Sequence, residues 1–301
     1  MKKIIIFLAF ALAFLGANEC QAMWKIEKNG TPTSYLIGTM HINYKTHELA
    51  PCMQEAINSS KALMTEIFMP ISQDEMINDD MIELMAMMMN PSNPNNLKSQ
   101  IGEDLYAKIE KILSKTKPEV VMMMPFLQDW AIELLNINLS TNEDLSETKG
   151  GDFMLSAFAK EKGITRLGLE KSTKSAEIFK QIPKDILHRD MKIGIEHIDE
   201  NSAMATQMVD WYNSGEIDKI LAFTFDKNKA LKYVPTMDRA FWEDLLYTKL
   251  LDDRTASWIE PILHQINKEP TTIAVGLGHI AKEKGLIKAL QNAGFSVTQM
   301  K

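Results

Sequence analysis

Apolar and polar positions alternate near the start of the chain in the manner of a β-hairpin. Trp24-Lys25-Ile26-Glu27 repeats with a period of two, Asn29-Gly30 supplies a turn, and Tyr35-Leu36-Ile37 resumes the apolar pattern. The second predicted strand ends at Gly38, and His41 follows it directly. The sequence therefore places a histidine just beyond the end of a strand.

The pattern then changes from a period of two to a helical one and back. A helix is predicted after His41 as far as Ile57, and the apolar run 62–68 predicts a buried strand that carries one carboxylate, Glu66. A later short strand, Thr165 to Leu169, arrives in the same way at Glu170. The order strand, histidine loop, helix and strand is typical of an α/β fold.

The middle of the chain reads mainly as helices. Residues 72–192 and 177–249 have helical periodicity, interrupted by prolines and by the loop 90–96, and residues 254–265 continue it. Near the C-terminus an apolar strand, 271–275, ends at Gly276, and a helix and a final strand follow it. We therefore expect an α/β fold with a central mixed β-sheet flanked by helices, built from both ends of the chain with a helical insertion between them.

The N-terminus predicts an exported protein. Lys2 and Lys3 precede the apolar run 4–15, and small residues follow as far as Ala22, which is the pattern of a signal peptide covering residues 1–22. The apolar run is shorter than the roughly 20 residues of a membrane span, so no stable membrane anchor is expected after its removal. No linker rich in Pro, Gly or Ser divides residues 23–301, which we interpret as a single domain in the periplasm or outside the cell.

Charge and cysteine content narrow the possible functions. Residues 1–22 carry Lys2, Lys3 and Glu19, so their removal changes the formal net charge from −7 to −8. An acidic exported protein is a poor candidate for binding nucleic acid. Cys20 would leave with the signal peptide, so Cys52 is predicted to be a lone buried thiol with no disulfide partner.

Two histidines share an unusual setting. His41 and His279 each follow an apolar strand in the spacing G-x-x-H, with Gly38 and Gly276 as the motif glycines. From the glycine and histidine content, about 0.3 such spacings are expected by chance. A single histidine after a strand is more often a hydrogen-bonded structural residue, but two in the same setting favour a site, because ligands of α/β sheets gather beyond the carboxyl ends of the strands.

Carboxylates close to these histidines could complete a metal site. Glu66 and Glu170 both lie in or at the end of predicted strands. Two neutral imidazoles and a carboxylate can hold a divalent cation and leave positions open for water and substrate. A water bound there could have its pKa lowered to about 7 and act as a nucleophile.

At these positions the sequence resembles the TraB/PrgY/GumN family, which includes the Tiki group of metalloproteases, and a GumN-like exported protein is the nearest likeness. The resemblance covers roughly residues 24–300. It rests on segments spread along the chain: Leu36-Ile37-Gly38-Thr39-Met40-His41, Ala62-Leu63-Met64-Thr65-Glu66-Ile67, Gly151-Asp152, Leu167-Gly168-Leu169-Glu170, Trp211-Tyr212, Gly215-Glu216, Asp253-Arg254, Trp258, Val275-Gly276-Leu277-Gly278-His279 and Gly285-Leu286.

The resemblance implies a fold like that of erythromycin esterases and ChaN-type proteins, with the site at the G-x-x-H loops. It implies that His41, Glu66 and His279 are the metal ligands and catalytic residues, with manganese or cobalt supporting cleavage of a peptide or protein substrate. Arg254 matches the family's arginine, which could steady a carboxylate or an oxyanion; the other interpretation is a surface salt bridge worth under about 1 kcal/mol. The residue after this arginine is often asparagine in the family and is Thr255 here, so no amide is carried over to that position.

Two further carboxylates match family positions and are second-tier candidates. Asp152 and Glu170 could belong to the site, or each could cap a helix or pair with a lysine. The leading hypothesis is an exported metal-dependent hydrolase acting on peptide bonds. The alternatives are an esterase-like hydrolase in which one histidine acts as general base without metal, and a non-catalytic binding or regulatory protein.

Overall fold

A computed structural model shows a mixed β-sheet flanked by helices, which confirms the predicted fold class. It describes residues 19–41, 48–135 and 150–300. Within these ranges the sheet has six strands in the order β4-β3-β5-β2-β1-β6. The strands are β1 (Met23–Glu27), β2 (Ser34–Thr39), β3 (Ala62–Ile67), β4 (Thr165–Glu170), β5 (Thr271–Gly276) and β6 (Ser296–Gln299).

The two ends of the chain meet in this sheet, as the sequence predicts. β1 and β2 form the expected antiparallel hairpin, with Trp24 opposite Leu36. β6 pairs antiparallel with the outer side of β1, so that Trp24 also lies opposite Gln299. The other four strands lie side by side in the order β4, β3, β5 and β2, and each pairs in parallel with its neighbour.

The central strands are buried because their sequences are apolar on both faces. Five of the six residues of β3, and likewise of β5, are buried. Continuous apolar runs of this kind are typical of parallel strands covered by helices on both faces. Glu66, which is 7% exposed, is therefore a charged group inside an apolar strand and needs a partner.

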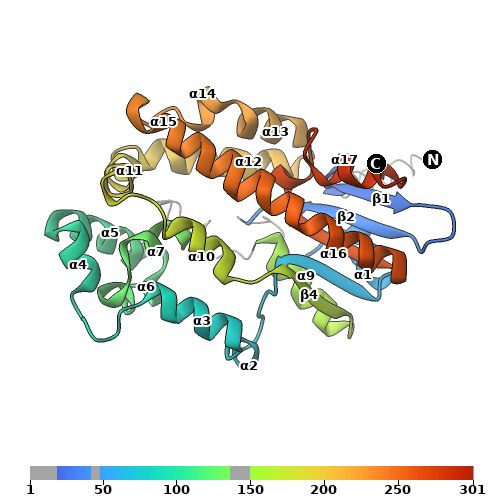
Figure 1. The fold of residues 1–301 in the computed structure, drawn as a ribbon, viewed down its shortest axis with the longest axis horizontal. Coiled ribbons are helices and arrows are strands. Elements are labelled where there is room, and N and C mark those ends of the chain that lie inside the picture. Colours follow the sequence, from blue (N-terminus) through green and yellow to red (C-terminus); the bar gives the residue numbers. More distant parts are fainter. Residues whose placement is uncertain (1–18, 42–47, 136–149, 301) are drawn as a thin grey trace, which may run out of the picture.

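Helices make up most of the rest of the chain. Helices α1 and α9 pack on each other and on the central strands, and α16 and α17 form a second packed pair against the sheet. In Figure 1 the strands gather at one side of the molecule, and the helices of residues 79–134 and 173–196, which belong to the insertion, occupy the other. The helices that contribute to the apolar core around the sheet are α1 (Pro51–Asn58), α9 (Gly151–Glu161), α12 (Ile198–Asn213), α13 (Ile217–Phe225), α16 (Arg254–Lys268) and α17 (Leu286–Asn292). Helices α14 (Lys227–Ala230) and α15 (Thr236–Glu243) follow α13, and Trp242 of α15 belongs to the core of the insertion.

The insertion has an apolar core of its own. Twenty buried residues of the described ranges, drawn from the stretch between Met88 and Leu245, form this core, while others from the same stretch, such as Leu155 and Tyr212, belong to the cluster that covers the sheet. The amphipathic helix α5 shows how it is built, because its buried residues Leu105, Ile109 and Leu113 recur every four positions on one face. The insertion helices are α2 (Gln73–Met76), α3 (Asp79–Met88), α4 (Asn96–Ile101), α5 (Glu103–Thr116), α6 (Pro118–Val121), α7 (Asp129–Leu134), α10 (Thr173–Phe179) and α11 (Lys184–Glu196), with a short 3₁₀ turn η2 (Met124–Phe126).

A wide helical segment leads into α16. Helix α15 continues into the π-helix η3 (Asp244–Asp253), which continues into α16. The backbone angles of Glu243 and Arg254, at the two junctions, are those of a right-handed helix, so the three segments form one uninterrupted helix. π-helical turns are rare and occur often at functional sites. Here the segment ends at Arg254, one of the predicted site residues.

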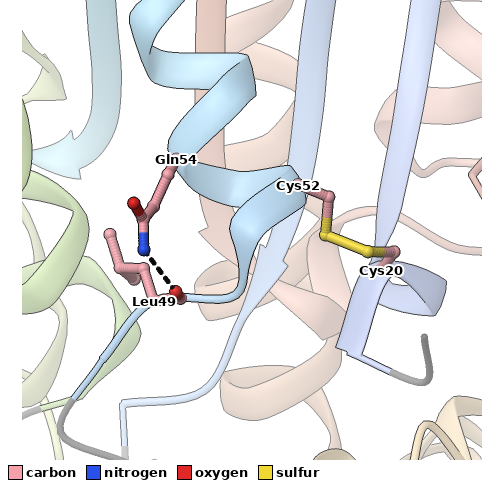
Figure 2. The surroundings of a disulfide bond; sticks show 4 residues. All are labelled: Cys20, Leu49, Cys52 and Gln54. Atoms are coloured by element: carbon pink, nitrogen blue, oxygen red, sulfur yellow. Dashed lines mark hydrogen bonds between the residues drawn. A yellow bond between two sulfur atoms is a disulfide. The ribbon is translucent and has the colours of Figure 1, made fainter. Parts of the chain in front are cut away.

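A disulfide ties the start of the domain to α1, and this corrects a prediction. Cys20 lies in a 3₁₀ turn, η1 (Glu19–Ala22), and is bonded to Cys52 in the first turn of α1. Figure 2 shows the bond, with Gln54 donating a hydrogen bond of 2.8 Å to the carbonyl of Leu49 beside it. The prediction that Cys52 is a lone thiol is therefore wrong.

The error came from the expected boundary of the signal peptide. Removal of residues 1–22 would take away Cys20 and with it the disulfide. It would also take away Ala22, which is buried, and Gln21, whose carbonyl accepts a 2.6 Å hydrogen bond from the Gln299 amide. Cleavage after Ala22 and the Cys20–Cys52 bond cannot both hold for the same mature chain. The signal peptide itself stays a prediction.

Replacing Cys52 by serine is expected to lower the free energy of unfolding by about 3 kcal/mol, because the bond closes a loop across 32 residues. The measurement is urea unfolding of the oxidised protein and of the variant. With reductant present the two proteins should unfold at the same urea concentration. Equal stability without reductant would contradict the disulfide.

None of the helices in the described ranges is long and apolar enough to cross a membrane.

Candidate active site

The structure brings the two G-x-x-H histidines together at the carboxyl edge of the parallel strands. His41 follows β2, and His279 ends the short turn η4 (Leu277–His279) after β5. The Nε2 atoms of His41 and His279 lie 3.9 and 3.8 Å from the same atom, Oε1 of Glu66. Glu66 and His279 are buried, whereas 57% of the His41 side chain is exposed, so the cluster opens to solvent on the His41 side.

Glu66 is held by donors on both of its oxygens. The backbone N–H of Gly276 donates to Oε1 at 2.7 Å, and the Arg254 guanidinium donates to Oε2 at 2.7 Å. Burial alone would raise the pKa of Glu66, but the neighbouring His41, His279 and Arg254 outweigh it and lower the pKa to about 2. Glu66 is therefore ionised and fixed in orientation.

The His41 ring is oriented by Asp152 at the start of α9. The Nδ1 atom of His41 lies 2.8 Å from Oδ2 of Asp152, and Thr39 donates to the other carboxylate oxygen at 2.8 Å. Partial desolvation of the ring lowers the pKa of His41, but the hydrogen bond and charge of Asp152 and then the charge of Glu66 outweigh this and raise the pKa to about 9. Asp152 neither caps a helix through its side chain nor pairs with a lysine in the described contacts; it supports His41.

His279 is supported by a neutral group instead. Its Nδ1 atom lies 2.7 Å from the hydroxyl of Thr255, and its ring packs against Trp258 with a centroid distance of 4.5 Å. Burial lowers the pKa of His279 to about 4, although Glu66 acts in the opposite direction. The two histidines thus differ in electrostatic surroundings as well as in exposure.

Arg254 bridges two carboxylates from different strands. Besides Glu66 it contacts Glu170, with its Nε donating to Oε1 at 2.7 Å, and the Trp258 indole donates to the other Glu170 oxygen at 2.9 Å. Arg254 is only 9% exposed and its third nitrogen points to the carbonyl of Leu250 at 3.3 Å. The surface salt-bridge interpretation is therefore wrong, and Arg254 steadies carboxylates.

The motif glycines are needed for space rather than for backbone freedom. Gly276 has φ −50° and ψ 136°, which any residue can adopt. A Cβ added to it would lie 3.0 Å from Oε1 of Glu66, 3.6 Å from the His279 ring and 3.8 Å from Nε2 of His41. At Gly38 a Cβ would come within 2.4 Å of the Leu277 side chain. Gly276 therefore keeps open the space that the three side chains share.

Substituting alanine for Gly276 is accordingly expected to remove most activity and metal binding while the fold persists. The methyl group would occupy the space between Glu66, His41 and His279. Metal affinity and thermal unfolding of the purified variant measure the two effects. Gly194→Ala, where a Cβ has no neighbour within 4 Å, is the control, and a Gly276→Ala protein with unchanged metal affinity would contradict this account.

Three supporting residues were not recognised from the sequence as members of the site. They are Thr39, Thr255 as a partner of His279, and Tyr212, whose hydroxyl donates to the carbonyl of Gly38 at 2.7 Å. Thr39 lies between the glycine and the histidine of the first motif, so its position was a usable signal. Nothing in the local pattern marks Thr255 or Tyr212, because their partners are 24 and 174 residues away.

A cavity of about 620 Å³ adjoins the site without including its centre. Its wall contains Thr255 and Gly278, beside His279, together with Phe225, Tyr247 and Lys282. None of His41, Glu66 and His279 lines it. The cavity is therefore bordered by Thr255, the hydrogen-bond partner of His279, and not by the three converging side chains themselves.

The donor set fits a divalent cation. Two imidazole nitrogens and a carboxylate oxygen converge, and each imidazole is hydrogen-bonded through its other nitrogen, as is usual for metal-ligating histidines. In the described ranges no group of three or more His, Cys, Asp or Glu side chains is already spaced to hold a metal ion. Each Nε2 atom lies 3.8 to 3.9 Å from Oε1 of Glu66, so the fit rests on the chemistry of the donor atoms.

The fold and this arrangement define an α/β protein with two histidines and a glutamate at the carboxyl edge of its sheet. The chain belongs to the TraB/PrgY/gumN family, whose model matches residues 22–299. No curated protein matches the chain, and no solved structure does.

Proposed function

We propose that the protein is an exported, metal-dependent hydrolase of peptide bonds, with His41, Glu66 and His279 holding one divalent cation, manganese or cobalt. The observation that carries the proposal is the convergence of two supported imidazoles on one oxygen of an ionised glutamate. The raised pKa of His41 places a proton between its ring and Glu66, and a divalent cation bound here would take the place of that proton. The resemblance to the Tiki group supplies the expectation of peptide as the substrate.

Each of the residues around the three proposed ligands has a defined part in this proposal. Asp152 and Thr255 orient the two imidazoles, and Arg254 together with Gly276 N–H holds Glu66 so that Oε1 faces them. A bound divalent cation would supply Lewis acidity and lower the pKa of a water molecule. Exposure of His41 leaves that side of the site accessible to a substrate.

Export is supported by the disulfide, and the charged and apolar pattern of residues 2–15 favours a signal peptide independently of the boundary at Ala22 that the disulfide excludes. Structural disulfides form and persist in oxidising compartments such as the periplasm or the cell exterior. The Cys20–Cys52 bond is of this structural kind, since it joins the first turn of the domain to α1.

A metal-independent hydrolase is the second candidate, and one observation favours it. The pKa of His41 is raised to about 9 and that of His279 is lowered to about 4, so a cationic acid and a neutral base stand on either side of Glu66. Such opposite shifts within one site are typical of acid–base pairs.

One experiment separates these functions from each other and from a binding protein. Purified oxidised protein is incubated with a peptide library, with Mn²⁺ in one series and with a chelator in the other. Cleavage that requires Mn²⁺ supports the proposal, and cleavage that survives the chelator supports the acid–base enzyme. Absence of turnover in both series, for peptides and for simple esters, would support a non-catalytic role.

A further inference from the structure

The hydroxyl of Thr255 makes two hydrogen bonds inside the protein. It lies 2.7 Å from the carbonyl oxygen of Leu251, one helical turn earlier, and 2.7 Å from Nδ1 of His279. Both Thr255 and His279 are buried, with 1% and 6% of their surfaces exposed. Water therefore does not compete for these bonds.

The chemistry of the groups fixes the direction of each bond. A carbonyl oxygen can only accept, so the single hydroxyl proton of Thr255 is donated to Leu251. The hydroxyl then has only lone pairs to offer His279, and Nδ1 must carry the hydrogen. A neutral imidazole protonated at Nδ1 has its lone pair on Nε2, the atom that lies 3.8 Å from Oε1 of Glu66.

We propose that Thr255 is a positioning residue that holds His279 in the Nδ1–H tautomer and so directs the Nε2 lone pair towards Glu66. The proposal rests on the proposed function in one respect, that a lone pair at this point is what a metal ligand or a general base requires. When His41 is neutral, as a metal ligand must be, the Asp152 carboxylate favours the same tautomer for it. The chain thus uses a charged acceptor for one histidine and a neutral hydroxyl for the other.

Valine tests this role because it has nearly the shape of threonine and lacks the hydroxyl. In Thr255→Val the Nδ1–H of His279 loses the hydroxyl acceptor and keeps the Leu251 carbonyl. The other tautomer, with a hydrogen on Nε2 facing Glu66, therefore gains population. Thr255→Ser keeps the hydroxyl and should behave as the wild type. Thr271→Val removes a buried hydroxyl at the far end of β5, which donates to the Glu269 carbonyl among the described residues, and serves as the control.

The readout is the ring tautomer, measured by ¹⁵N–¹H NMR of the metal-free full chain with labelled histidine, the His279 signal being the one that His279→Gln removes. We expect the Nδ1–H pattern in wild type, Thr255→Ser and Thr271→Val, and a shift towards Nε2–H in Thr255→Val. Titration with Mn²⁺ alone should show about 10- to 100-fold weaker binding in Thr255→Val than in Thr255→Ser.

The two readouts distinguish failure of this inference from failure of the proposed function. An unchanged tautomer in Thr255→Val overturns the positioning role, whatever the protein binds. A changed tautomer in a protein that binds no Mn²⁺ in any form supports the positioning role and counts against the metal-dependent hydrolase.

Discussion

Glu66→Gln is expected to reduce metal-dependent peptide hydrolysis on the order of 10³-fold or more in kcat/KM. Glutamine keeps the size of the side chain and can still accept the Gly276 N–H, but it removes the negative charge that faces His41 and His279. A neutral amide oxygen is a far weaker ligand for a divalent cation than a carboxylate is. The measurement is steady-state cleavage of a peptide that the wild-type protein turns over with Mn²⁺.

The control for this substitution is Glu83→Gln. Glu83 is an exposed carboxylate on α3 whose only described ion pair, with Lys171, is 3.5 Å long, so its replacement should leave the rate unchanged. Thermal unfolding of Glu66→Gln shows whether the protein is folded. A folded Glu66→Gln protein with a nearly wild-type rate would mean that Glu66 is not in the reacting site.

Arg254→Met is expected to lower the free energy of unfolding by about 3–5 kcal/mol, because it leaves two buried carboxylates without their cation. Glu66 and Glu170 both lie within 2.7 Å of this guanidinium, and their side chains are only 9% and 8% exposed. Arg254→Lys should recover part of the loss, since one ammonium cannot match both carboxylates as the planar guanidinium does. Urea unfolding at pH 7 measures the change.

A surface ion pair provides the comparison for Arg254. Lys284 contacts Asp252 at 2.6 Å, but 73% of its side chain is exposed, and Lys284→Met should cost less than about 1 kcal/mol. A double variant, Arg254→Met with Glu170→Gln, should be less unstable than the sum of the single changes, because Glu170 would no longer be an unpaired charge. A loss as small as that of Lys284→Met would show that Arg254 does not neutralise a buried pair.

The sheet could be predicted because its strands carry simple patterns. The hairpin of β1 and β2, the apolar runs of β3 and β5 and the final strand β6 are found where the periodicity placed them, and the pairing of β6 with β1 agrees with a sheet built from both ends of the chain. The two histidines could be predicted to meet because each follows a strand, and the parallel strands end at one edge of the sheet.

What could not be predicted depends on partners distant in sequence. Arg254 reaches Glu66 and Glu170 across 188 and 84 residues, so its burial is not visible in its own helix. The need for glycine at position 276 is also not visible locally, because its backbone is ordinary and the space beside Glu66 is what excludes a side chain. The disulfide could not be predicted together with a signal peptide that ends at Ala22, because cleavage there would remove Cys20.

Binding of Mn²⁺ to the purified, chelator-stripped and oxidised protein, followed by isothermal titration calorimetry, tests the central claim most directly. The proposed site predicts one Mn²⁺ per chain in the wild type, and loss of this binding in Glu66→Gln and in His279→Ala, while Glu83→Gln retains it. Absence of stoichiometric binding by Mn²⁺ and Co²⁺ in the wild type, or equal binding in all four proteins, would contradict a metal site formed by His41, Glu66 and His279.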